Sequence, residues 1–427
     1  MKDVISAIAT ASGVGGVAII RVSGEGALEI ARTMFSRKGE YVPNMLYPGT
    51  IDCGNFTDRG MCVYFRAPHS FTGEDVVELH CHGGTEIARG VLRRTIELGA
   101  RLADRGEFTK RAYLNAKLSL SAAEGLGEMI AASSEAQVRA GYVLYREVLT
   151  EQGKSLQKEL TECLAQINAD LDYPEEDLTA QSRPEISSRL MKVRESLLSL
   201  FKQYGAGRKI KTGVRVALVG EPNAGKSSLL NALLGYERAI VSEIPGTTRD
   251  INEGVIAIEG VNFLLTDTAG LRESDDVIER EGVRRAQQAI LGADVIVWLK
   301  GGERPEFPEA TPVITVGAKS DLEKRTDCDV ALSSLTGEGI EEFKRLLYER
   351  GFGRENDGAY LLSERHYAAV QKALAQVERA LAALDDQLPE LYAEDIRQAW
   401  ETLGVISGET AGEAVINEIF AKFCVGK

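Results

Sequence analysis

The chain has 427 residues, of which 64 are acidic, 50 are Lys or Arg and 44% are hydrophobic, and its net charge is −14. A chain of this length can form two to four domains with ordinary cores. Its acidity excludes a protein that binds nucleic acid over its whole surface, although residues 1–120 hold 15 Lys or Arg against 13 Asp or Glu. No apolar run is long enough to span a bilayer and no signal peptide is recognisable, so we expect a cytosolic protein. The six cysteines have no paired spacing, which favours reduced thiols.

The first 118 residues are expected to form an α+β domain. Runs of apolar and β-branched residues predict strands, and apolar residues at helical spacing predict helices. The strands are expected at Val17–Val22, Cys62–Phe65 and Val76–Cys81, and the helices at Ala27–Phe35 and Thr85–Leu98.

Helical segments are predicted on both sides of a central region. Apolar residues recur every three or four positions over 156–171 and 186–201, and Gly205–Gly207 predicts a hinge after them. Further helices are expected at Ala368–Leu384, Ile396–Ile406 and Glu413–Phe423. We therefore expect segments 119–207 and 354–427 to pack into one bundle, with residues 208–353 inserted as a self-contained α/β domain.

The inserted region contains a phosphate-binding motif at Gly220–Ser227. The apolar run Val214–Val219 precedes it as a strand, and Ser227–Leu234 follows with helical periodicity, which is the context that this motif requires. Glycines let backbone N–H groups close around phosphates, and the helix N-terminus adds partial positive charge. Lys226 is placed for the β- and γ-phosphates, and Ser227 for Mg²⁺.

Two further motifs are expected on the phosphate side of the site. The strand Val261–Thr266 ends in Asp267–Gly270, where Asp267 can reach Mg²⁺ through water and the Gly270 N–H can meet the γ-phosphate. Between this strand and the phosphate loop, Pro245–Asp250 offers the Thr248 hydroxyl as a second Mg²⁺ ligand.

This chain has no water-orienting side chain at the position where Ras-like enzymes have one. Those enzymes have Gln after the Asp-x-x-Gly motif, whereas this chain has Leu271, which cannot hold water. Another polar side chain is required, and the following segment offers Glu273, Asp275, Asp276 and Glu279.

The part of the nucleotide site that binds the base is predicted at Ala318–Asp321 and at Ser333 and Ser334. In GTPases the first motif reads Asn-Lys-x-Asp, and its carboxylate accepts two hydrogen bonds from the guanine edge. Asp321 supplies that carboxylate, which predicts guanine preference. Because Ala318 replaces the usual Asn, we expect weaker GDP binding than in a Ras-like protein.

One connection in this domain is unusually short. Only about a dozen residues, Lys300–Thr311, separate the expected strands Ala293–Leu299 and Pro312–Val316, and two of them are prolines. A parallel crossover normally contains a helix, so we expect a shortened or missing helix on that side of the sheet.

Over its whole length the sequence resembles the bacterial tRNA wobble-uridine modification GTPases of the MnmE (TrmE) family. Three local matches carry the resemblance: Ala7–Thr10 with Gly15–Gly24, Phe71–Glu78 with His82–Gly84, and the tail Phe423–Lys427. Ser12 and Val14 depart from it, because the family usually has Pro and Arg at these positions.

The resemblance implies an N-terminal folate-binding-like domain that forms a constitutive homodimer. It places 5-formyl- or 5,10-methylene-tetrahydrofolate on Arg21, Glu78, Lys117 and Lys427. Cys424 is either a catalytic thiol or a small hydrophobic residue that packs against Phe423. The resemblance also implies a flavoprotein partner (MnmG, also called GidA), a tRNA substrate shared with it, and a (carboxymethyl)aminomethyl group at C5 of the wobble uridine as the product.

For the inserted Ras-like domain, the resemblance implies GTP hydrolysis that depends on K⁺ and on pairing of two such domains. It gives the water-orienting role to Glu279 and K⁺ to Asn223, with Ser242, Ile244 and Thr247. The complete expected GTP site is Asn223, Ala224, Gly225, Lys226, Ser227, Ser228, Thr247, Thr248, Asp267, Thr268, Ala269, Gly270, Lys319, Asp321, Ser333 and Ser334.

Two other classes of GTPase would explain the nucleotide motifs equally well. A switch that binds ribosomal RNA would not explain the folate-like N-terminal stretch or the Cys and Lys tail, and no RNA-binding module is recognisable at either end. A membrane-transport GTPase would need spanning segments that the sequence lacks.

Overall fold

The computed structural model describes residues 3–172, 179–237, 253–268, 287–302, 304–323, 325–353, 363–384, 389–408 and 412–426. These residues divide into two compact units. The first consists of segments 1–127, 145–155 and 403–427, and the second of segments 128–144 and 156–402. The domain boundaries at 118, 207 and 353 stay predictions.

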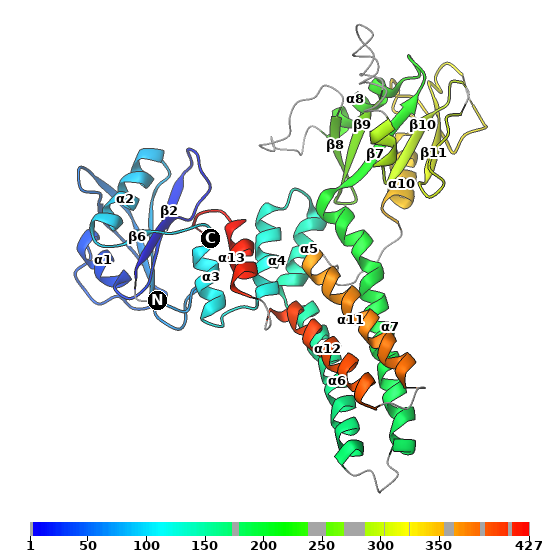
Figure 1. Cartoon of the computed structure of the whole chain (residues 1–427). Helices are drawn as coiled ribbons and strands as arrows, with labels where there is room; N and C mark the ends of the chain where they lie inside the picture. Colours follow the sequence, from blue (N-terminus) through cyan, green and yellow to red (C-terminus); the bar gives the residue numbers. More distant parts are fainter. Residues whose placement is uncertain are drawn as a thin grey trace, which may run out of the picture. The chain divides into compact units, whose positions relative to one another are not determined.

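The first unit is built on a six-stranded mixed sheet with the order β3-β4-β5-β2-β1-β6 (Figure 1). Alternate residues of β2, such as Ile20 and Val22, are fully buried in the core that includes residues of α1 and α2. The α+β prediction is therefore confirmed, although β3 and β6 were not predicted. The strands are β1 Ile5–Ile8, β2 Val17–Ser23, β3 Leu46–Asp52, β4 Thr57–Phe65, β5 Val76–His82 and β6 Arg101–Leu102; the helices are α1 Ala27–Met34, α2 Thr85–Glu97 and α3 Glu107–Leu114.

Helices from before and after the inserted domain pack together, as the sequence predicted, but the helix predicted at residues 413–423 belongs to the first unit and not to the bundle. Figure 1 shows α11 beside α7 and α12 beside α6. Arg194 of α7 donates to Glu378 of α11 at 3.0 Å, and Gln157 of α6 donates to the Trp400 carbonyl of α12 at 3.0 Å. The helices are α4 Leu120–Ala131, α5 Glu135–Tyr145, α6 Val148–Asp172, α7 Thr179–Thr212, α11 Glu364–Ala383, α12 Pro389–Ser407 and α13 Glu413–Ala421.

The predicted hinge at Gly205–Gly207 is wrong, because α7 continues through it to Thr212. Helix packing outweighs the cost of glycine in a helix, which is about 1 kcal/mol per residue. The chain leaves the helix at Gly213 instead, where φ is +81°. Among the helices of the described residues, none is both long and apolar enough to cross a membrane.

The inserted domain has a second six-stranded sheet, with the order β12-β11-β10-β7-β9-β8. All neighbouring strands are parallel except the edge strand β8, which is antiparallel to β9. Ligands of such sheets bind outside the carboxyl ends of the parallel strands. The strands are β7 Val214–Gly220, β8 Glu253–Ile258, β9 Val261–Asp267, β10 Val295–Leu299, β11 Val313–Ala318 and β12 Val330–Leu332; the helices include α8 Lys226–Glu237 and α10 Ile340–Gly351.

The short crossover from β10 to β11 contains no helix in its described residues, 300–302 and 304–312. Phe307 packs instead on the cluster formed by Ala217, Val219 and Ile296. The Arg304 guanidinium lies 5.9 Å from the centre of the Trp298 ring and 5.8 Å from that of Phe307. A loop therefore covers the sheet face where a helix is usual, as the spacing predicted.

A buried arginine stabilises the first unit. Arg111 of α3 is only 1% exposed, and its guanidinium bonds Asp3, Glu74 and Glu107 at 3.0–3.1 Å. Burial works to raise the pKa of Glu107, but hydrogen bonds from Arg101 and Arg111 hold that pKa below its usual value of 4.5. The ion pairs of Glu107 with Arg101 and Arg111 therefore stabilise the fold above pH 4.5. Their contribution to the free energy of unfolding is lost as Glu107 becomes protonated at lower pH.

Replacing Arg111 by Ala should lower the free energy of unfolding of this unit by about 3–5 kcal/mol, because the variant leaves buried carboxylates unpaired. Urea titration at pH 7 measures the loss. Arg32→Ala is the control, since the exposed Arg32–Glu29 pair should contribute less than about 1 kcal/mol. Equal stability of the two variants would show that Arg111 is not needed to offset these charges.

Candidate functional site

The phosphate motif forms the turn between β7 and α8, as predicted. Asn223 and Gly225 have φ values of +65° and +102°, so the backbone makes the left-handed turns that this loop requires. The buried Lys226 ammonium donates to the carbonyl oxygens of Gly220 and Glu221, both at 2.7 Å. The loop thus places the lysine and the N-terminus of α8 where they can bind phosphates.

The predicted Mg²⁺ ligands that the structure describes lie together beside this loop. The Ser227 hydroxyl donates to Asp267 Oδ2 at 2.6 Å, and Asp267 is 2% exposed at the carboxyl end of β9. Thr268 is held to β7 by hydrogen bonds from its hydroxyl and its backbone N–H to the Leu218 carbonyl. A hydroxyl and a buried carboxylate fit Mg²⁺, which prefers oxygen ligands.

The base motif lies next to the phosphate loop. Lys319 adopts φ +61°, and its ammonium donates to the Asn223 carbonyl at 2.9 Å. A Cβ added to Gly225 would lie 3.6 Å from the Ala318 Cβ, so the two motifs are adjacent where Asn is usual. Asp321 is exposed, so its carboxylate is accessible to a base.

The loop after β12 supports the base motif from the other side. The buried Ser333 hydroxyl accepts hydrogen bonds from the N–H groups of Leu335 and Thr336 at 3.3 and 3.2 Å. The Ser320 N–H donates to the Leu332 carbonyl at 3.1 Å, which joins this loop to the Lys319–Asp321 turn. Ser334, the other predicted residue, is half-buried in the same loop.

Several predicted residues lie outside the described residues. They are Ser242, Ile244, Thr247, Thr248, Ala269, Gly270, Glu279 and Lys427, as well as Leu271, Glu273, Asp275 and Asp276. Their roles stay predictions.

In the first unit, the structure brings Arg21 and Glu78 together on adjacent strands. The Arg21 Nε donates to Glu78 Oε1 at 2.9 Å, and Arg21 lies 5.6 and 5.7 Å from the ring centres of Phe71 and Phe108. Burial works to raise the pKa of Glu78, but His80 and Arg21 hold it below its usual value. The two rings were not predicted as site residues, although Phe71 begins one of the family-like stretches.

Lys117 lies against the loop that supplies Phe71. Its ammonium donates to the Pro68 carbonyl at 3.0 Å, and a Cβ added to Gly73 of the same loop would lie only 3.3 Å from Lys117 Cγ. The exposed Lys117 is therefore connected to the Arg21–Glu78 pair through residues 68–73.

The C-terminal tail is ordered by the first unit as far as Gly426. Arg105 Nε donates to the Phe423 carbonyl at 2.9 Å, and the Gly106 N–H donates to the Cys424 carbonyl at 3.3 Å. Cys424 is exposed and has a free thiol, so packing against Phe423 does not explain it. Its possible catalytic role stays a prediction.

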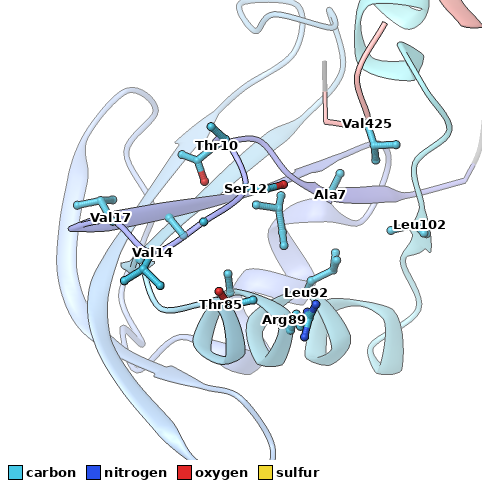
Figure 2. Close-up of a pocket in the computed structure, with 17 residues that line it drawn as sticks. Ala7, Thr10, Ser12, Val14, Val17, Thr85, Arg89, Leu92, Leu102 and Val425 are labelled. Atoms are coloured by element: carbon cyan, nitrogen blue, oxygen red, sulfur yellow. The ribbon is translucent and has the colours of Figure 1, made fainter. Parts of the chain in front are cut away.

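A cavity of about 650 Å³ lies under the loop Thr10–Gly15 in the same unit. Figure 2 shows Thr10, Ser12 and Val14 on this loop, Thr85, Arg89 and Leu92 on α2, and Val425 from the tail. Arg21, Glu78 and Lys117 are not among its lining residues. These three predicted folate residues and the cavity are therefore different places on the unit.

Two family models match this chain. A family model described as the MnmE helical domain matches residues 120–424, and one described as the GTP-binding protein TrmE N-terminus matches residues 4–117. The chain belongs to the MnmE family. The tRNA modification GTPase MnmE of Aquifex aeolicus is 38% identical and that of Thermus thermophilus 40% identical, and each alignment covers 100% of this chain and at least 99% of the relative.

Members of the MnmE family are tRNA modification GTPases, and this chain is accordingly a GTP hydrolase with a role in tRNA modification. A structure of Aquifex aeolicus Era bound to GDP and AlF₄⁻ is similar over 38% of this chain and 65% of that chain, at 29% identity and a TM-score of 0.26.

Asp321→Asn should reduce the preference for GTP over ATP or invert it, because the amide can no longer accept two hydrogen bonds from guanine. Each charge-assisted hydrogen bond contributes about 1.5–3 kcal/mol, so we expect at least a tenfold loss of GTP affinity. Fluorescence titration with GTP and ATP measures both affinities. Glu323→Gln, an exposed change two residues away, should leave them unaltered; unchanged discrimination in the Asp321 variant would remove Asp321 from base recognition.

Proposed function

We propose that this GTPase, with a flavoprotein partner, uses a one-carbon unit from 5,10-methylene-tetrahydrofolate as the methylene carbon of a (carboxymethyl)aminomethyl group that is installed at C5 of the wobble uridine of tRNA. The observation that supports the folate step best is the Arg21–Glu78 pair, whose arginine lies 5.6 and 5.7 Å from the ring centres of Phe71 and Phe108. A carboxylate suits the edge of a pterin, which carries hydrogen-bond donors.

Charge supports the same placement of folate. The lowered pKa of Glu78 keeps its carboxylate ionised at neutral pH, so that it can accept hydrogen bonds from the pterin. Arg21 and Lys117 supply positive charge for the carboxylates of the glutamate tail. Lys427 would add a second ammonium.

The proposed partners are a second copy of the chain, the flavoprotein MnmG and tRNA. Exposed apolar side chains at the edge of the cavity support self-association through the first unit: Val14, Val17 and Leu102 are 89%, 56% and 50% exposed. Apolar patches of this kind mark interaction sites. We place the protein in the cytosol, which fits its six free cysteines.

We also propose that hydrolysis uses K⁺ and Mg²⁺. Ser227 and Thr248 would bind Mg²⁺, with Asp267 acting through water. Asn223 is exposed on the phosphate loop, where its side chain could bind K⁺ with Ser242, Ile244 and Thr247 once two nucleotide domains meet. A cation there would stabilise the charge that develops on the transferred phosphoryl group, the role that an arginine has in other GTPases.

The modification itself is tested by supplying methylene-tetrahydrofolate labelled with ¹³C at the transferred carbon to the protein, its flavoprotein partner, GTP and tRNA. Mass spectrometry of the wobble nucleoside should show one labelled carbon. Unlabelled product would remove folate as the carbon source and leave the GTPase assignment intact.

Arg21→Ala should weaken binding of 5-formyl-tetrahydrofolate at least tenfold, because it removes a charge-assisted hydrogen bond worth about 1.5–3 kcal/mol. Calorimetry on the full chain measures the affinity, and thermal unfolding checks that the unit stays folded. Arg37→Ala is a matched control, because it removes an arginine that stacks on Tyr47 in the same unit. An unchanged folate affinity would place the ligand elsewhere.

Glu279→Ala should lower kcat for GTP with little change in nucleotide affinity, which is the signature of an interaction made only in the transition state. Wild-type hydrolysis should be faster in K⁺ than in Na⁺ and should rise with pairing of the nucleotide domains. Steady-state assays in the two salts measure both effects. If the variant matches the wild type in saturating K⁺, then Glu273, Asp275 and Asp276 are the next candidates for holding the water.

A further inference from the structure

The tip of the β8–β9 hairpin is hydrogen-bonded to the start of helix α5. The Ala136 N–H donates to the Gly260 carbonyl at 2.9 Å, and Asn262 Nδ2 donates to the Ser133 hydroxyl at 3.0 Å. Asn262 is only 8% exposed. Gly260 has φ +76°, and a Cβ there would lie 3.2 Å from the Glu135 Cβ, so the turn fits closely on the helix.

This contact completes the N-terminus of α5. The first N–H groups of a helix have no partner within the helix. At α5, Ser134 accepts from the Gln137 N–H at 3.3 Å, and Gly260 supplies the acceptor for Ala136. A residue of the nucleotide domain thus satisfies a backbone donor of the helical region.

The network continues to the end of α7. The Ser133 hydroxyl donates to Gln137 Oε1 at 3.2 Å, and Gln137 Nε2 donates to the Lys211 carbonyl at 2.9 Å. We call the set of Ser133, Ala136, Gln137, Gly260 and Asn262 the hairpin clasp. It joins the hairpin tip to two helices through five residues.

The same hairpin reaches the nucleotide site at its other end. β9 runs from the clasp to Asp267, which accepts from Ser227. Asn262 and Asp267 are five positions apart, which corresponds to about 16 Å along a strand. Among the described residues β8 pairs only with β9 and forms the edge of the sheet, so it has fewer restraints than the central strands. The turn that joins these two strands carries the clasp.

We propose that the hairpin clasp couples the state of the nucleotide to the helical region: GDP and GTP favour different degrees of clasp closure. Coupling requires that the hydrogen bonds of the clasp form to a different extent in the GDP-bound and GTP-bound states. The clasp suits this requirement, since it consists of a few hydrogen bonds at the tip of a two-stranded element rather than a large apolar interface. Linkage is reciprocal, so a change at α5 would also alter nucleotide affinity.

The Ala136 amide reports on the clasp directly, because its hydrogen-bond acceptor lies on Gly260. Hydrogen exchange of the full chain, read by mass spectrometry on peptides covering 133–140, should be compared in GDP and in a non-hydrolysable GTP analogue, both with Mg²⁺ and K⁺. We expect the protection of this amide to differ about fivefold or more between the two nucleotides, which is the lower end of typical coupling. Equal protection in both would overturn the proposal and leave the clasp a static anchor.

Asn262→Ala should remove most of this nucleotide-dependent difference, and Glu259→Gln at the same turn should keep it. Ser133→Ala breaks the same hydrogen bond from the helix side and replaces the first variant if that one does not fold. The proposal would also be overturned if folded Asn262→Ala or Ser133→Ala protein kept the full difference in Ala136 amide protection between GDP and the GTP analogue. No folate, tRNA or partner protein enters this experiment, so its outcome is independent of the modification chemistry.

Discussion

The nucleotide site depends on the parallel pairing of β7, β9, β10 and β11, which brings their carboxyl ends to one edge of the sheet. Each motif follows one of these strands, so side chains almost one hundred positions apart become neighbours. The hydrogen bond from Lys319 to the Asn223 carbonyl is the most direct example, because it ties the turn after β11 to the phosphate loop after β7. Without that shared edge, the motifs would be isolated polar turns with no common ligand.

The nucleotide site could be predicted from the sequence because its chemistry restricts the residue types. Gly225 must turn left-handed, Lys226 must be cationic, and a buried apolar strand must precede them, so local sequence carries the information. Long-range pairing was harder to predict. β1 is only four residues long and β6 only two, and their pairing is fixed by contacts that no local pattern encodes. Gly205–Gly207 misled the prediction because neighbouring helices hold α7 straight despite two flexible residues.

In the N-terminal unit, the sequence indicated the charged residues but not their surroundings. Arg21 and Glu78 lie 57 positions apart, and only the antiparallel register of β2 and β5 makes them partners. The contribution of Phe108 depends on how α3 packs, which residue spacing does not reveal. Arg111 is the clearest case, since a lone arginine in an amphipathic helix indicates an exposed side chain, whereas here three separate residues, Asp3, Glu74 and Glu107, supply its oxygen acceptors.

The two junctions of the inserted domain lie side by side. The chain enters at Gly213, after α7, and leaves after α10, and Lys209 of α7 donates to the Gly351 carbonyl at the end of α10 at 2.7 Å. Because the two ends of the inserted domain lie close together, the chain re-enters the helical bundle near the point where it left. The insertion therefore does not separate α7 from the segment that leads to α11. The nucleotide domain can therefore be regarded as an elaborated loop of the helical scaffold, and its excision with a short linker between Thr212 and Phe352 would not break any helix among the host's described residues.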